Sequence, residues 1–170
     1  MSFSIKYNIL SLLLVFLTSS VFAQKQYEYF ESDTLNYVFF PKGEGMYIPV
    51  SWVFGREAKK DTSFHIKQTN FTKDDYTQTN LILKQQLDTC SFNADINYAA
   101  FKKYLQQYGA YNTSKGARVA YINCVCSKSM FANTWKTQMA DALDGGKCFY
   151  HIAVDLTNKK IISIWYNTSG

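Results

Sequence analysis

The most constraining feature of the sequence is a strongly alternating stretch close to its C-terminus, residues 147–167. Apolar side chains occupy every second position on each side of a break at 157–160, as in Cys148, Tyr150, Ile152, Val154, Leu156, Ile162, Ile164 and Tyr166. This spacing predicts a β-hairpin with one apolar face. Because an isolated hairpin is marginal in water, we expect further strands beside it and a helix over it.

The opposite face of this hairpin is mixed in character and is the candidate binding surface. It carries Phe149, His151 and Trp165, and Tyr47 belongs to an earlier stretch that also alternates. Since Trp and Tyr dominate interface hot spots, we predict that these four residues contact a partner. The alternative is that a helix covers this face and the same side chains are core. The sequence is compatible with both.

The N-terminus has the pattern of a secretory signal peptide. Lys6 supplies a positive charge, an apolar run covers 9–17, and Val21-Phe22-Ala23 ends with a small residue at the expected cleavage point. The run is far shorter than the roughly 20 residues that a membrane span needs. We therefore predict a signal peptide at 1–23, a single domain at 24–170, a periplasmic or secreted location, and no membrane span after cleavage.

Hydrophobic periodicity predicts the order of elements in this domain. Strands are expected at 34–40, 46–54 and 62–68, where they would form an antiparallel meander. A helix at 73–87 follows a capping box formed by Thr72 and Asp75. A strand is expected at 117–126 and a third helix in the segment 127–144 before the final hairpin.

A second helix is predicted from Asp95 to Tyr108. Apolar side chains recur at intervals of three and four residues, and Gly109 follows where a left-handed helix cap belongs; these side chains are Phe101, Tyr104, Leu105 and Tyr108. The complete pattern predicts an α+β fold. We expect an antiparallel sheet of about six strands with two to three helices packed mainly on one face and stabilised by disulfides.

The sequence contains four cysteines, an even number that is typical of disulfides in an exported chain. Cys124 and Cys126 lie on the same side of one strand, so a bridge between them would be strained. We predict the pair Cys126–Cys148, across the neck of the segment 127–147, which leaves Cys90–Cys124. Closing this loop of about 20 residues would stabilise the fold by roughly 3 kcal/mol.

Metal-binding and catalytic interpretations of the same residues fit the sequence less well. The ligand spacings C-x-x-C and H-x-x-x-H are missing, and a strand would place His151 and Cys148 on opposite faces. No nucleophile elbow, P-loop or dinucleotide-binding motif occurs. We therefore assign no catalytic residue, no metal ligand and no cofactor.

The charge pattern excludes a nucleic-acid stripe. The chain has 18 basic and 13 acidic residues, but the basic ones are scattered, with no cluster longer than two. We predict a small, exported, non-catalytic binding protein with a protein partner in the envelope or outside the cell. An inhibitor or an immunity-type protein that neutralises an exported toxin is the concrete form. A hydrolase whose groups converge only in the folded chain and a small-ligand carrier remain alternatives.

Overall fold

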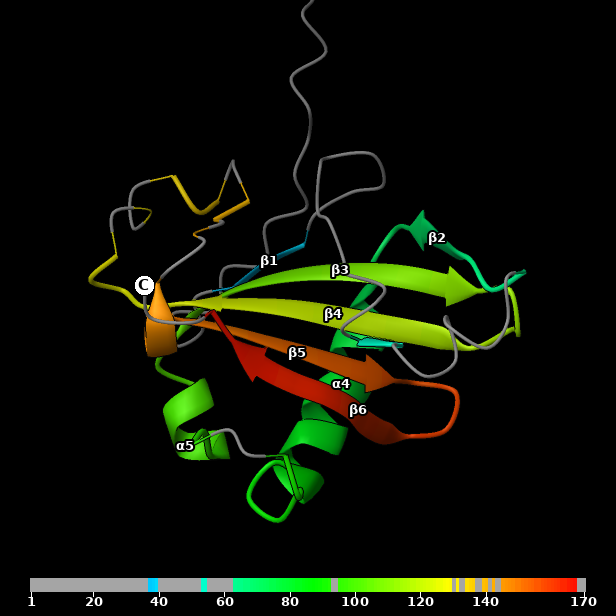
Figure 1. Cartoon of the computed structure of the whole chain (residues 1–170), viewed down its shortest axis with the longest axis horizontal. Coiled ribbons are helices and arrows are strands. Elements are labelled where there is room, and N and C mark those ends of the chain that lie inside the picture. The colour runs from blue at the N-terminus through cyan, green and yellow to red at the C-terminus, as the bar shows by residue number, and fades with distance from the viewer. Residues whose placement is uncertain are drawn as a thin grey trace, which may run out of the picture.

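A six-stranded mixed sheet forms the centre of the structure (Figure 1). The computed structural model describes residues 37–39, 53–54, 63–92, 95–129, 131, 134–136, 139–140, 142 and 145–167, and the structural statements below concern these residues. The strands are β1 (Tyr37–Phe39), β2 (Ile66–Thr69), β3 (Leu105–Thr113), β4 (Arg118–Val125), β5 (Phe149–Asp155) and β6 (Lys160–Tyr166).

The strands are arranged in the order β1-β3-β4-β5-β6, with β2 also paired to β3. From β3 to β6 all neighbours are antiparallel. β1 runs parallel to the first half of β3, with Tyr37 opposite Gln106, whereas β2 runs antiparallel to its second half, with Ile66 opposite Thr113. The two short strands thus share one edge of the sheet, and β6 forms the other edge.

Helix α4 (Lys73–Gln86) and the short helix α5 (Tyr98–Phe101) lie on the same side of the sheet (Figure 1). The predicted capping box of α4 is confirmed, since the Thr72 hydroxyl accepts from the Asp75 N–H at 3.1 Å and the Thr72 N–H donates to the Asp75 carboxylate at 2.8 Å. A single 3-10 turn, η1 (Gly146–Cys148), precedes β5.

Apolar side chains pack on both faces of the sheet. The helix-side cluster contains Leu83 and Leu87 from the α4 region, Phe101 from α5, and Tyr108, Ile122 and Ile152 from the strands. The opposite cluster contains strand residues such as Tyr121 and Phe149 together with Val53, Phe54 and Trp135, which come from outside the sheet. The sheet is therefore buried on both sides, and the fold is α+β.

The predicted helix from Asp95 to Tyr108 is wrong beyond Phe101. Residues Leu105–Thr113 form β3, and Gly109 lies inside this strand rather than at a helix end. Because both faces of β3 are buried, its sequence does not alternate between apolar and polar residues. The apolar spacing therefore imitates a helix.

The predicted N-terminal meander and purely antiparallel sheet are also wrong. β1 is parallel to β3 and β2 is antiparallel to it, so β1 and β2 run in opposite directions, whereas the first and third strands of a meander run in the same direction. Most of the strand expected at 46–54, including Tyr47, lies outside the described residues, and Val53 and Phe54 are buried without belonging to a strand. The described residues of 127–144 form turns and irregular structure instead of the expected helix.

The disulfide Cys126–Cys148 is confirmed, with the two Cα atoms 4.8 Å apart. It lies at the junction where β4 ends and β5 begins, as the Cys126 N–H donates to the Cys148 carbonyl at 2.9 Å. Cys90 and Cys124 are free thiols, so the second predicted bridge is not formed. Cys124 is fully buried in the helix-side cluster, and the Cys90 thiol donates to the Leu87 carbonyl.

Candidate functional site

A row of polar side chains crosses the face of the sheet opposite the helices. Strand register places Gln107 of β3 beside Asn123 of β4, Asn123 beside His151 of β5, and His151 beside Trp165 of β6. Gln107, Asn123 and His151 are all buried. We call these three residues the polar row.

The polar row binds the backbone of the segment that follows β4. Asn123 donates to the Ala140 carbonyl at 2.6 Å and to the Gln107 side-chain oxygen at 2.8 Å. That oxygen also accepts the Ala140 N–H at 3.0 Å, and the Gln107 amide donates to the Trp135 carbonyl at 2.5 Å. An irregular segment has backbone groups that no ladder satisfies, and the polar row satisfies several of them.

His151 is held by hydrogen bonds on both ring nitrogens. Its Nδ1 lies 2.9 Å from the Tyr121 hydroxyl, and its Nε2 lies 2.9 Å from Oδ1 of Asn167. The Asn167 amide donates to the Ala142 carbonyl, which orients its oxygen toward His151. An amide oxygen only accepts, so Nε2 donates to Asn167, and the Tyr121 hydroxyl is the partner of Nδ1. The ring also stacks on Tyr121 and Trp165, so this histidine is fixed within the fold.

The predicted binding residues are only partly accessible. Phe149 is 4% exposed and His151 is 5% exposed, while Trp165 is half-buried. Phe149 is covered by an irregular segment rather than by the helix considered from the sequence, since Phe131 packs edge-on against it. Tyr47 lies outside the described residues. An open face at Phe149 and His151 is therefore not present.

A second polar cluster joins α4 to the sheet. Arg118 at the start of β4 donates to both carboxylate oxygens of Asp75 at 2.6 and 2.5 Å, and it also donates to the Asn70 carbonyl. Burial raises the pKa of Asp75, but hydrogen bonds from Arg118 and Thr72 lower it by more, so its pKa lies below the usual range. The sequence does not indicate this pair, because 43 residues separate its members.

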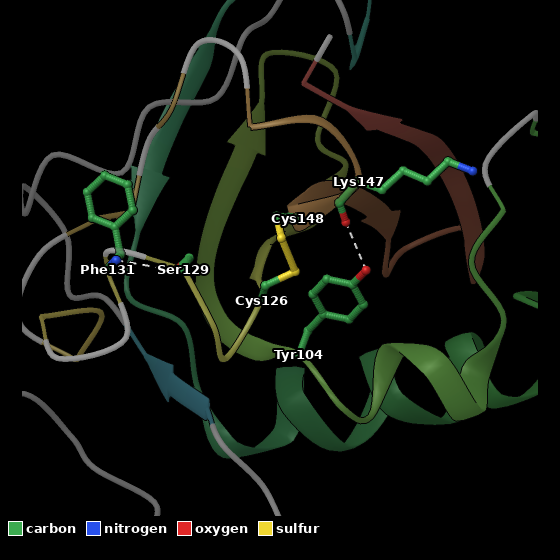
Figure 2. The surroundings of a disulfide bond; sticks show 6 residues. All are labelled: Tyr104, Cys126, Ser129, Phe131, Lys147 and Cys148. Atoms are coloured by element: carbon green, nitrogen blue, oxygen red, sulfur yellow. Dashed lines mark hydrogen bonds between the residues drawn. A yellow bond between two sulfur atoms is a disulfide. The ribbon is translucent and has the colours of Figure 1, made fainter. Parts of the chain in front are cut away.

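The neck of the 127–147 segment is held by the disulfide and by Tyr104 (Figure 2). The Tyr104 hydroxyl donates to the Lys147 carbonyl at 2.9 Å, one residue before Cys148. Burial raises the pKa of Tyr104 to about 12 and that of the Cys124 thiol well above its usual value. Both groups are therefore neutral at physiological pH and serve structural roles.

The edge of β6 offers backbone hydrogen bonds that no described strand uses. The Asn167 N–H donates to the Phe149 carbonyl at 3.2 Å, so alternation turns the N–H and C=O groups of Tyr166 and Ile164 away from β5. No described strand pairs with β6 on that side (Figure 1). At the start of β6 the edge is closed, since Gln86 accepts the Ile161 N–H at 3.1 Å and donates to the Lys159 carbonyl.

Neither the chemistry of the described residues nor a comparison with known proteins gives a further indication of function. Among the residues that the structure describes, no group of three or more potential ligands could hold a metal ion, and no helix is both long and apolar enough to cross a membrane. No protein-family model, curated protein or solved structure matches the chain.

Proposed function

We propose that the chain is an exported, non-catalytic binding protein that captures a protein partner by strand pairing at the β6 edge, and that it acts on this partner as an inhibitor or immunity-type protein. The single observation that carries the proposal is the outward direction of the Ile164 and Tyr166 backbone groups. Such an edge is a template for another strand.

Protection of this edge is incomplete. Proteins shield edge strands with lysines, bulges or covering groups. In β6 these devices all lie at its beginning: Lys160, the register shift opposite Ala153 and Val154, and the Gln86 side chain. The second half, 164–166, has none of them among the described residues, which favours pairing with a partner.

The side chains around the open half suit a protein interface. Trp165 and Tyr166 are half-buried and point to opposite faces of the sheet, so an added strand would contact an aromatic side chain on each face. Each backbone hydrogen bond contributes about 1 kcal/mol net, and the aromatic contacts would add to this affinity. The disulfide Cys126–Cys148 supports export, because disulfides persist in oxidising compartments.

Two variants of one residue test the proposal. Tyr166→Pro removes the outward N–H, and proline is tolerated where that N–H faces solvent at an edge. Tyr166→Ala removes the same ring but keeps the N–H. With each chain immobilised and exposed to the exported proteins of the cell, we expect Tyr166→Ala to retain a partner that Tyr166→Pro loses.

Thermal unfolding of both variants verifies that they are folded. Capture of no protein by the unmodified chain would contradict the proposal, and so would equal capture by both variants. Loss of the partner in both variants would show that the Tyr166 ring, and not strand pairing, makes the interaction. This outcome would also contradict the proposal.

A further inference from the structure

Exposed lysines lie at both edges of the sheet, at the end where β6 begins. Lys67 lies on β2, Lys115 in the β3–β4 turn, and Lys159 and Lys160 at the β5–β6 turn. Backbone contacts place these elements at one end, since the Ser114 N–H donates to the His65 carbonyl and the Leu156 N–H to the Arg118 carbonyl. Figure 1 shows the two turns at the same end of the strands.

The buried carboxylates at this end are already engaged. Asp75 binds Arg118, and Asp155 accepts from the Asn158 N–H at 2.9 Å and from its side-chain amide at 2.8 Å. No carboxylate in the described part of the chain pairs with Lys159 or Lys160. These two lysines lie at the closed beginning of β6, before its open half, and give that end of the strand a positive local potential.

We propose that the open half of β6 pairs with part of an extended acidic peptide of the partner protein, and that this peptide continues along the strand to place carboxylates beside Lys159 and Lys160. This inference rests on the proposed function and adds the chemistry of the partner to it. The backbone edge selects a polypeptide, because alternate N–H and C=O groups match only another strand. The lysines select the sign of its charge and its position along β6.

A nucleic acid fits this end less well than a peptide. A backbone-binding surface for a nucleic acid needs basic residues that form a stripe. Here Lys67, Lys115 and the Lys159–Lys160 pair come from three separated elements. A phosphate chain accepts from N–H groups but offers no donor to the outward carbonyls of Ile164 and Tyr166.

The experiment uses three probes and the full chain purified from the exported fraction. The probes are labelled peptides of about ten residues that alternate Val with Glu or Val with Lys, and an oligothymidylate of similar length. Fluorescence anisotropy measures their binding at about 0.05 and 0.15 M salt. We expect the Val-Glu peptide to bind, more weakly at the higher salt, and the other two probes not to bind.

Two matched variants each replace two lysines by glutamates, which reverses the charge at these positions. Lys159→Glu with Lys160→Glu should weaken Val-Glu binding by at least about tenfold. Lys67→Glu with Lys73→Glu makes the same change in net charge at the β1–β2 edge, which is the opposite edge of the sheet, and should change binding by less than about twofold. Tyr166→Pro should abolish binding of this peptide.

Each of the other possible results would refute a specific part of this inference. No Val-Glu binding, equal binding of the Val-Lys peptide, or equal effects of both lysine pairs would refute an acidic partner segment. Oligothymidylate binding as tight as Val-Glu binding would replace it with a general polyanion surface. Partner capture that is lost in Tyr166→Pro but unchanged in the Lys159 and Lys160 variant would refute this inference alone and leave the proposed function standing.

Discussion

At the scale of single residues, the amide of Asn123 connects the sheet to the segment that covers it. Asn123→Leu removes two donated hydrogen bonds and leaves the Ala140 carbonyl buried without its partner. We expect the variant to lose about 2 kcal/mol of unfolding free energy, which is the usual cost of such a buried unpaired group. Urea denaturation measures it, and an unchanged midpoint would show that the amide does not hold the segment.

A core role and a surface role of Phe149 predict different effects of its truncation on stability. Because it is 4% exposed and packs edge-on against Phe131, Phe149→Ala should destabilise the fold by about 3 kcal/mol. Trp165→Ala should cost less, since Trp165 is half-buried. Thermal unfolding measures both changes. An unchanged melting temperature for Phe149→Ala would restore the surface role that the sequence suggests.

At the scale of elements, one ion pair contributes to the docking of α4 on the sheet. The pKa of Asp75 is lowered in the folded chain, so its stabilisation is complete above the unfolded value near 3.9 and disappears as pH falls through the folded value. Asp75→Asn should cost about 2 kcal/mol at neutral pH, less than for a fully buried pair because Arg118 is partly exposed.

Denaturation at a series of pH values tests this assignment. The unmodified chain should lose stability below about pH 4 more steeply than Asp75→Asn. Lys147 and Asp95 form an exposed pair that serves as a control, and Asp95→Asn should leave the stability at neutral pH nearly unchanged. Parallel pH profiles for Asp75→Asn and the unmodified chain would contradict a stabilising role of the pair.

Local signals explain which elements the sequence predicts. Helix α4 has its own cap in Thr72 and Asp75, and the final hairpin has a clear alternation, so both are found. β3 has neither, because neighbours cover both of its faces and Gln106 and Gln107 are as buried as Tyr108. The same holds for the candidate site: alternation places Phe149 and His151 on one face, but what covers that face depends on distant segments.

At the scale of the whole molecule, the features that the sequence does not predict are contacts between distant segments. The parallel pairing of β1 with β3, the Arg118–Asp75 ion pair and the docking of Trp135 on Gln107 all join residues far apart in the chain. No local sequence pattern indicates any of these three contacts. The disulfide Cys126–Cys148 is predictable because the strand order places the end of β4 beside the start of β5.

Counting thiols tests the covalent state of the whole chain. The structure has two free cysteines, whereas the pairing Cys90–Cys124 expected from the sequence would leave none. We expect a thiol reagent to detect about two groups in the denatured, unreduced chain and about four after reduction. In the native chain Cys124 should react slowest, because it is fully buried and burial raises the pKa of its thiol. Detection of no thiol before reduction would show that Cys90 and Cys124 are bridged.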